Sequence, residues 1–340
     1  DSKAVLMVSG ESAKLTVLNG TITAGGVGDC GMYGIYVADG GNVILGDADT
    51  KTGPTIKTWF AAVGENNTTS PANITIYGGE YTAQAAPTES NWWAYFCAPV
   101  YASASGNITI SGGTFNGYYG ISSRYVNVGQ NLNISGGTFN GSNSALFVDT
   151  KSGVECSETR TIAITGGTFS SDPSAYVAEG YTAIPAGENV WNVVEGNWVT
   201  PATVATKEYK ESNMTYHFAA GTYSGTTMLE VGTNTNTVFE AADGAEFENL
   251  TIKYKVNRYN ETDKSSSSMT VKGFKVTGTL DINCADGTLV VEGNIAKTAK
   301  ITMNRQDGKE NASILIKDNK FDGGKYGIQL IPNHSHYTLT

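Results

Sequence analysis

The stretch Asn107-Ile-Thr-Ile-Ser-Gly-Gly-Thr-Phe-Asn-Gly117 decides the fold, because the chain repeats it. It returns almost unchanged at 131–141 and 161–171, and looser copies stand at 73–81 and 14–22. Each copy alternates apolar with polar residues, passes through a glycine turn and adds one more apolar residue. That order predicts a short strand, a turn and a second strand. Repetition at intervals of a few tens of residues is typical of solenoid proteins.

Aligning the copies places their apolar residues in columns. The first inward residue of each copy forms one column: Leu15, Val43, Ile74, Ile108, Leu132 and Ile162. A second column stands two residues later, so both point to the same side of a strand. A third column, seven residues after the first, supplies the opposite wall of the same core: Ile22, Tyr81, Phe115, Phe139 and Phe169.

A further short phrase, with copies such as Tyr33-Gly-Ile and Tyr119-Gly-Ile, adds a third strand to each repeat. Three strands per repeat predict an all-β fold, a parallel β-helix in which like residues stack about 4.8 Å apart. The absence of a 3.6-residue period excludes the ankyrin, leucine-rich and tetratricopeptide repeats. A β-sandwich stays open as the alternative, although it does not require consecutive strands to carry the same phrase.

The repeats fall into two segments. They stop after Phe169, and 190–199 reads as a hairpin with two tryptophans that would cap the open end of the stack. We therefore expect a first β-helical segment with its cap at 1–200 and a second segment at 201–340. Repeats resume in altered form in the second segment, where one series of strands starts at Val238, Met269, Leu289 and Ile314. Because the chain begins and stops abruptly, we expect the natural protein to be longer.

Composition excludes several classes of function. The net charge is −10, charged residues make up 16%, and Lys and Arg form no cluster, so nucleic acid is not an expected partner. No window reaches the ~18 apolar residues of a membrane span. The chain has three His, and its four cysteines lack the spacing of a zinc site, so we expect no metal and no other cofactor.

Both segments resemble the right-handed parallel β-helix, or pectin-lyase-like, superfamily, which includes pectate lyases, polygalacturonases and many bacterial surface proteins. The Gly-Gly-Thr-Phe phrase and the stretch Ser-Asp-Pro-Ser-Ala-Tyr-Val-Ala-Glu-Gly-Tyr-Thr-Ala at 171–183 are similar to repeats in adhesin-like surface proteins of gut bacteria. The resemblance covers most of 13–184 and, more weakly, 220–340. It implies a right-handed helix and an extracellular or bacterial cell-surface location.

The motifs of the enzymes in that superfamily are absent. Asn-Thr-Asp, the Asp-Asp pair, Gly-His-Gly and Arg-Ile-Lys of the polygalacturonases do not occur. A glycosidase needs two carboxyl groups about 5–10 Å apart, and no pair of repeats carries acids at matching positions. We therefore expect no catalytic residues. A polysaccharide lyase or glycoside hydrolase on the same fold stays the alternative.

Three polar features are considered as candidate sites. Arg124 and Asp149 stand at equivalent places of successive repeats, so stacking should bring them together, either as a ligand-binding pair or as a surface ion pair worth under ~1 kcal/mol. We favour the ion pair. The stretch Asp47-Ala-Asp-Thr-Lys-Thr-Gly53 opens like a calcium loop but lacks the later acidic ligand, which favours a solvated turn. His334 and His336 would share one side of a strand, and two ligands rarely hold a metal.

An aromatic cluster is a further candidate. The insertions 25–32 and 84–93 fall in the same turn of two repeats, and the next repeat carries two tyrosines there. The residues concerned are Trp92, Trp93, Tyr95, Tyr118 and Tyr119. Aromatic faces beside Asn, Thr and Gly suit stacking on sugars, although the same rings could fold inward over their own insertion.

The sequence as a whole predicts a secreted or cell-surface bacterial protein. We expect a monomer that acts as a structural or adhesin-like module without catalytic activity. Its expected partner is a carbohydrate or a host-surface glycoprotein.

Overall fold

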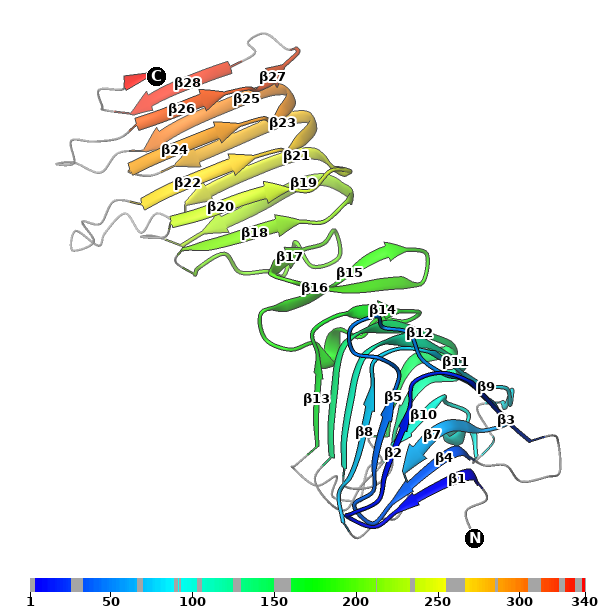
Figure 1. Cartoon of the computed structure of the whole chain (residues 1–340). Coiled ribbons are helices and arrows are strands. Elements are labelled where there is room, and N and C mark those ends of the chain that lie inside the picture. Colours follow the sequence, from blue (N-terminus) through cyan, green and yellow to red (C-terminus); the bar gives the residue numbers. More distant parts are fainter. Residues whose placement is uncertain are drawn as a thin grey trace. The chain divides into compact units, whose positions relative to one another are not determined.

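The chain folds almost wholly into β-strands. The computed structural model describes residues 4–25, 33–65, 70–88, 91, 93–102, 106–124, 130–149, 160–211, 213–232, 236–254, 267–284, 287–304, 313–323, 328–333 and 338–339. The only helical elements within these residues are two short 3-10 turns, η1 (Ala94–Phe96) and η2 (Ser174–Tyr176). The chain divides into two compact units, Asp1–Glu195 and Gly196–Thr340, close to the boundary expected near residue 200 (Figure 1). We call them the N-terminal unit and the C-terminal unit.

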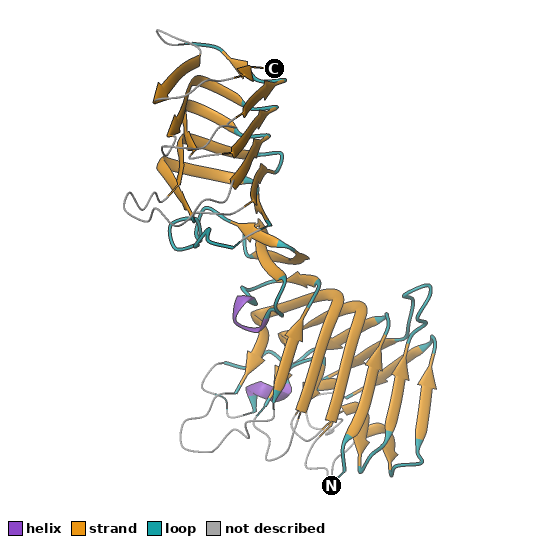
Figure 2. Cartoon of the chain, turned by 90° about the vertical axis from the view of Figure 1, so that its left-hand side faces the viewer, coloured by secondary structure: helices purple, strands orange, loops and turns teal. Residues whose placement is uncertain are grey.

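The N-terminal unit contains three parallel ladders of strands within one sheet (Figure 2). The first ladder holds β1 (Ala4–Ser9), β4 (Tyr33–Ala38), β7 (Ala61–Glu65) and β10 (Val100–Ala102). The second holds β2 (Lys14–Val17), β5 (Asn42–Leu45), β8 (Ala72–Ile76) and β13 (Thr161–Ile164), and the third holds β3 (Thr21–Ala24), β6 (Thr55–Thr58), β9 (Glu80–Ala83) and β14 (Gly167–Phe169). The long strands β11 (Gly106–Ser123) and β12 (Gln130–Val148) take part in all three. The predicted all-β fold with long parallel sheets is confirmed.

The apolar columns lie in register, as the sequence predicts. Ile108 pairs with Leu132, and Leu132 pairs with Ile162 of the following repeat. The third column stacks its rings: the Phe139 centroid lies 4.8 Å from Phe115 and 4.8 Å from Phe169. These three rings are buried, so the stack forms the centre of the core.

The Gly-Gly turn is required by two separate constraints. The first glycine of each pair lies against the preceding repeat: a Cβ on Gly112 would stand 2.3 Å from the carbonyl oxygen of Tyr77, and one on Gly136 would stand 2.7 Å from that of Ser111. The second glycine has a positive φ, 104° at Gly113. Side chains are excluded at both positions, by contact at one and by backbone conformation at the other.

One end of the N-terminal unit is covered by a hairpin of β15 (Tyr181–Gly187) and β16 (Val190–Glu195). Strand β16 pairs antiparallel with β14, and its Val193 is buried in the core. The hairpin expected at 190–199 is therefore wrong in position. Its turn contains Asn189, which adopts a positive φ of 52°, whereas 195–197 lead from β16 into β17 (Asn197–Val199) of the C-terminal unit.

Strands of the C-terminal unit alternate between two parallel sheets. The first sheet holds β17, β18 (Met214–Phe218), β20 (Asn236–Ala241), β22 (Ser267–Lys272), β24 (Gly287–Glu292), β26 (Ser313–Lys317) and β29 (Thr338–Leu339). The second holds β19 (Gly221–Val231), β21 (Ala245–Tyr254), β23 (Lys275–Cys284), β25 (Ile295–Asn304), β27 (Lys320–Phe321) and β28 (Ile328–Asn333). Thr237, and not Val238, pairs with Met269, so the strand start that the sequence aligned with Met269 is wrong by one position.

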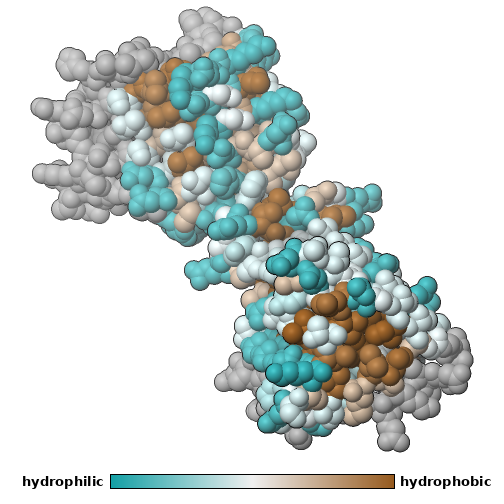
Figure 3. All heavy atoms as spheres, in the orientation of Figure 1, coloured by the Kyte–Doolittle hydropathy of each residue, from teal (hydrophilic) through white to brown (hydrophobic). Residues whose placement is uncertain are grey.

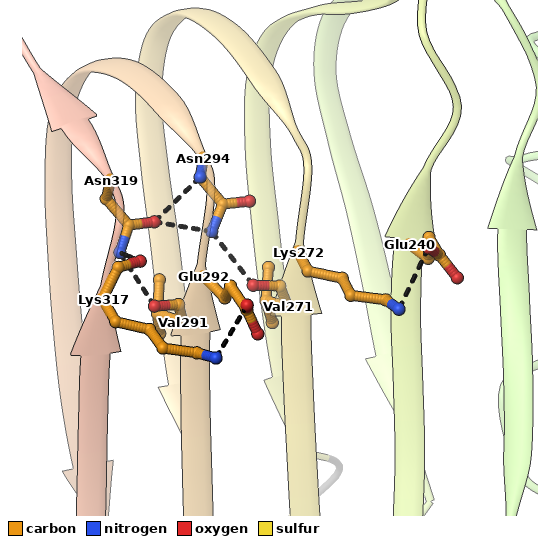
Figure 4. Close-up of polar contacts among 8 residues, drawn as sticks. All are labelled: Glu240, Val271, Lys272, Val291, Glu292, Asn294, Lys317 and Asn319. Carbon is orange, nitrogen blue, oxygen red and sulfur yellow. Dashed lines mark hydrogen bonds and ion pairs between the residues drawn. The ribbon is translucent and has the colours of Figure 1, made fainter.

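Asparagine side chains close the turns of the C-terminal unit (Figure 4). The Asn294 side chain is buried and donates from Nδ2 to the Val271 carbonyl oxygen at 2.9 Å and to Asn319 Oδ1 at 2.9 Å. Asn319 in turn donates to the Val291 carbonyl oxygen at 2.8 Å. Each amide thus ties one repeat to the repeat before it. The same figure shows ion pairs between neighbouring strands on the outer face, such as Lys272 with Glu240 at 3.0 Å.

Candidate functional site

A polar groove runs along the stacked Gly-Gly-Thr turns of the N-terminal unit. Its volume is ≈ 680 Å³. Its lining residues come from successive turns and from strand β16: Lys51, Gly79, Gly112, Gly113, Thr114, Gly136, Gly137, Thr138, Gly167, Thr168, Asn192, Val193 and Val194. Because glycine is required at these turns, main-chain peptide groups form much of the groove wall.

Threonine hydroxyls recur along the groove. Thr114 pairs with Thr138, and Thr138 pairs with Thr168, so one half-buried hydroxyl stands on each of three successive repeats. At one end, Thr168 Oγ1 donates to Asn192 Oδ1 at 2.9 Å. No carboxylate is among the lining residues. The groove can therefore donate and accept hydrogen bonds at regular intervals without presenting negative charge.

Lys51 supplies the positive charge of the groove. Its backbone adopts a positive φ of 56°, which is uncommon for a residue with a side chain. Its Nζ donates to Ser111 Oγ at 3.1 Å and lies 5.3 Å from the centroid of the Tyr77 ring. The two contacts place the ammonium group beside the turns of the third and fourth repeats.

The groove was not predicted from the sequence, in which the Gly-Gly phrase indicates only a turn. The available signal was the residue after each glycine pair. Threonine follows Gly-Gly in three successive copies, although the packing of the core does not require threonine at a position that faces outward.

The predicted aromatic residues divide between two packed clusters. Trp93 is half-buried, with its ring centroid 5.6 Å from that of Phe60, and Tyr95 packs on Phe96 at 4.4 Å. Tyr118 and Tyr119 belong to a second cluster, in which Tyr119 stacks on Phe147 at 4.6 Å. Trp92 lies outside the described residues, as do 26–32 and 255–266. Stacking of these rings on a sugar stays a prediction.

The structure brings Arg124 and Asp149 together, as predicted. Arg124 Nε lies 3.9 Å from Asp149 Oδ2, and its guanidinium carbon lies 3.7 Å from the centre of the Tyr95 ring. Partial burial acts to lower the pKa of Arg124, but a polar contact with Tyr101 and the surrounding charges raise it overall. Arg160 donates to the carbonyl oxygens of Arg124 at 2.8 Å and of Asp149 at 3.2 Å. These contacts link the residue that follows β11 to the residue that follows β12.

The turn at 47–53 was expected to be solvated. Its first carboxylate, Asp47, accepts hydrogen bonds from other residues of the same turn. Asp47 Oδ1 accepts hydrogen bonds from the backbone nitrogens of Asp49 at 3.0 Å and Thr50 at 2.8 Å, and from Thr50 Oγ1 at 2.9 Å. The bonds from Thr50 lower the pKa of Asp47. Across the described segments, no three His, Cys, Asp or Glu side chains gather as metal ligands would. His334 and His336 lie outside those segments.

No family model matches the chain, and neither does any curated protein or any solved structure. In the part of the chain that the structure describes, no helix has the length and apolar character needed to cross a membrane. A functional argument for this chain therefore rests on its own residues.

Proposed function

We propose that both units are right-handed parallel β-helices and that the chain is a member of the pectin-lyase-like superfamily. In the N-terminal unit each strand pairs in parallel with the strand that holds the same place one repeat earlier, which supports a helical path. Parallel crossover connections are almost always right-handed, which supports the hand. The alternation between two parallel sheets supports the same fold for the C-terminal unit.

The proposed function is non-catalytic binding of a carbohydrate by a secreted or cell-surface bacterial protein, with the groove as the binding site. The observation that carries this proposal is the column formed by Thr114, Thr138 and Thr168 beside the glycine main chain. A sugar chain presents hydroxyl groups that donate and accept, and this wall offers both functions at each repeat. The proposed location rests on the resemblance of the repeats to those of adhesin-like surface proteins.

Charge and length narrow the ligand class. The chain carries a net charge of −10, which disfavours long-range attraction of an acidic polymer. Lys51 and Thr168 lie about four repeats apart, so the groove spans roughly 20 Å at the spacing of parallel strands. A neutral oligosaccharide of several residues fits these limits, either free or as the glycan of a host-surface glycoprotein.

The experiment is a screen of the whole chain on a glycan array, followed by calorimetry with the ligand that binds best. The test variant combines Thr114→Val and Thr138→Val, which keep the shape of the groove and remove two hydroxyls. Loss of two hydrogen bonds should weaken binding about tenfold. The control is Thr109→Val, because Thr109 is an exposed threonine of the same strand β11 outside the groove.

Equal affinity of the double variant and the wild type would exclude the groove as the site. A glycoside hydrolase would need two carboxyl groups across the bound sugar, and the groove lining contains none. We therefore expect no new reducing ends when the bound glycan is incubated with the protein. Their appearance would favour the enzymatic alternative.

A further inference from the structure

The groove along the Gly-Gly-Thr turns has a positive charge at one end. Among the described residues that line it, Lys51 alone is charged, whereas the opposite end is formed by Asn192, Val193 and Val194 of β16. The segment 161–195, which includes β16, contains no lysine or arginine and four acidic residues, all exposed: Asp172, Glu179, Glu188 and Glu195. The two ends of the groove therefore differ in charge.

The turn that carries Lys51 packs against the next repeat. Gly78 has no room for a Cβ, because the Lys51 carbonyl oxygen lies against it. At the other end of the side chain, Nζ donates to Ser111 Oγ at 3.1 Å and lies beside the Tyr77 ring. The backbone and the ammonium group are thus both held in place. A lysine that is already restricted loses less conformational freedom when a ligand binds.

The Lys51 ammonium group keeps hydrogen-bond donors for a ligand. An ammonium group has three N–H donors, and Ser111 accepts from one of them. Within the described segments, Lys51 forms no ion pair. The carboxylate of Asp47, in the same turn, instead accepts hydrogen bonds from the backbone nitrogens of Asp49 and Thr50. The groove therefore contains a cation that no described carboxylate neutralises by contact.

Hydroxyl groups lie beside this ammonium group. Ser111 accepts from Lys51 through its oxygen, so its own proton is available to a ligand. Thr114, three residues further along the same turn, lines the groove and is half-buried. The oxygens of a carboxylate or a sulfate ester act as acceptors, and hydrogen bonds to a charged group are about twice as strong as neutral ones. A cation flanked by hydroxyl donors is therefore more complementary to an anionic group than to a neutral sugar hydroxyl.

We propose that the ligand of the groove carries one anionic group, a carboxylate or a sulfate ester, at the end that lies against Lys51. The rest of the glycan is neutral and runs along the threonine column toward β16. This inference rests on the proposed function, because it takes the groove as the glycan site. It is compatible with the net charge of −10, since an ion pair at contact distance does not depend on long-range attraction. On the face of the N-terminal unit drawn in Figure 3, strongly hydrophilic residues form separate teal areas, which provide no continuous charged surface for a polymer that is acidic along its length.

Calorimetry with three forms of one oligosaccharide tests the proposal. The forms are the best neutral ligand from the glycan array, the same chain ending in a carboxylated sugar such as sialic acid, and the same chain ending in a sulfated sugar. We expect at least one anionic form to bind the wild type about tenfold more tightly than the neutral form. Equal affinity for all three forms overturns this proposal. The variant with Thr114→Val and Thr138→Val tests the groove itself, so failure of this proposal and failure of the proposed function can be told apart.

Lys51→Met tests whether this residue sets the preference, because methionine keeps much of the apolar stem and removes the charge. The variant should bind the anionic form no more tightly than the neutral form, and its affinity for the neutral form should equal that of the wild type. The control is Lys57→Met, because Lys57 is an exposed lysine of β6 in the same repeat and lies outside the groove. A Lys51→Met variant that keeps the preference overturns the proposal, as does an equal loss of affinity for both forms.

Glu80 gives a test of opposite sign. It is exposed, lies outside the groove lining and pairs in register with Thr114 of the next repeat. Glu80→Gln removes a negative charge near the proposed anion, so it should tighten binding of the anionic form about two- to fivefold and leave the neutral form unchanged. Raising the NaCl concentration from about 0.05 to 0.5 M should weaken binding of the anionic form alone. Affinity for the anionic form that is independent of salt, or that falls in Glu80→Gln, contradicts the ion pair with Lys51.

Discussion

At the scale of single residues, the two glycines of each turn are constrained for different reasons. Gly112 has no room for a side chain because the Tyr77 carbonyl oxygen of the preceding repeat lies against it. Gly113 has more room but a φ of 104°. A sequence shows only two adjacent glycines, so the separate causes appear only when the neighbouring repeat is in place.

Gly112→Ala should therefore destabilise the N-terminal unit by about 1–3 kcal/mol, because the added methyl group must push two repeats apart. The measurement is urea denaturation followed by circular dichroism. Gly10→Ala is the control for backbone conformation alone, since Gly10 has a φ of 101° and no atom within 4 Å of an added Cβ. A cost well below 1 kcal/mol at Gly112 would contradict the packing argument.

Cys97 is buried, and desolvation raises the pKa of its thiol to about 12. The thiol should therefore stay protonated and unreactive in the folded chain at pH 8, where iodoacetamide labels exposed cysteines. Peptide mapping by mass spectrometry should find Cys97 unmodified in the native protein and labelled in denaturant. Rapid native labelling would show that this part of the fold opens.

The same shift has a consequence for stability. The unfolded thiol loses its proton near its usual pKa, whereas the folded thiol keeps it to higher pH. The contribution of Cys97 to stability is thus complete below the unfolded pKa and falls as pH rises toward 12. Cys97→Ala should flatten this decline in alkaline denaturation curves.

At the scale of elements, the stacked phenylalanines hold successive repeats in register. Phe139 is fully buried between Phe115 and Phe169, so Phe139→Ala should cost about 3–5 kcal/mol of unfolding free energy. Asn140→Ala is the matched control, because Asn140 is the next residue, is exposed and makes one side-chain bond to Asn116. It should cost about 1 kcal/mol or less. Similar costs at the two positions would argue against the stacked core.

The sequence predicted elements well where one repeat looks like another. Apolar alternation placed Ile108, Leu132 and Phe139 inside the core, because a period of two has a single solution when one side is buried. It failed at Thr237, a buried threonine that pairs with Met269. Because threonine is polar, the apolar Val238 was aligned with Met269 instead. It also misplaced the hairpin, since the tryptophan at 198 looked like part of the cap but lies on β17 of the next unit.

The candidate sites were predictable only in part, for a related reason. The approach of Arg124 to Asp149 follows from repeat spacing alone. The groove does not, because it depends on how turns of several repeats line up with β16, whose strand direction reverses the pattern of the preceding strands. The partition of Trp93 and Tyr119 into separate clusters likewise depends on ring packing that no periodicity encodes.

At the scale of the whole molecule, each unit has a core of its own. We expect the two cores to unfold independently, which hydrogen exchange measured by mass spectrometry can resolve unit by unit. Phe139→Ala should speed exchange in the N-terminal unit alone. Phe247→Ala should do so in the C-terminal unit alone, because Phe247 is buried there and stacks on Tyr223 at 4.1 Å. Matching changes in both units after either substitution would contradict independent folding.

Strands β11 and β12 pair position by position over most of their length, so a whole repeat could be lost or copied as one piece. Strand β8 pairs with β11 from Ala72 to Ile76, and β12 carries like residues at those positions except the first, where Gln130 stands in place of Gly106. A recombination event that removed or copied one whole repeat would leave the surviving neighbours with most of the contacts they already make. Each event would also shorten or lengthen the groove by one strand spacing of about 4.8 Å. Unequal crossing-over in the gene would therefore change the length of the groove, and with it the length of ligand that the proposed site accepts.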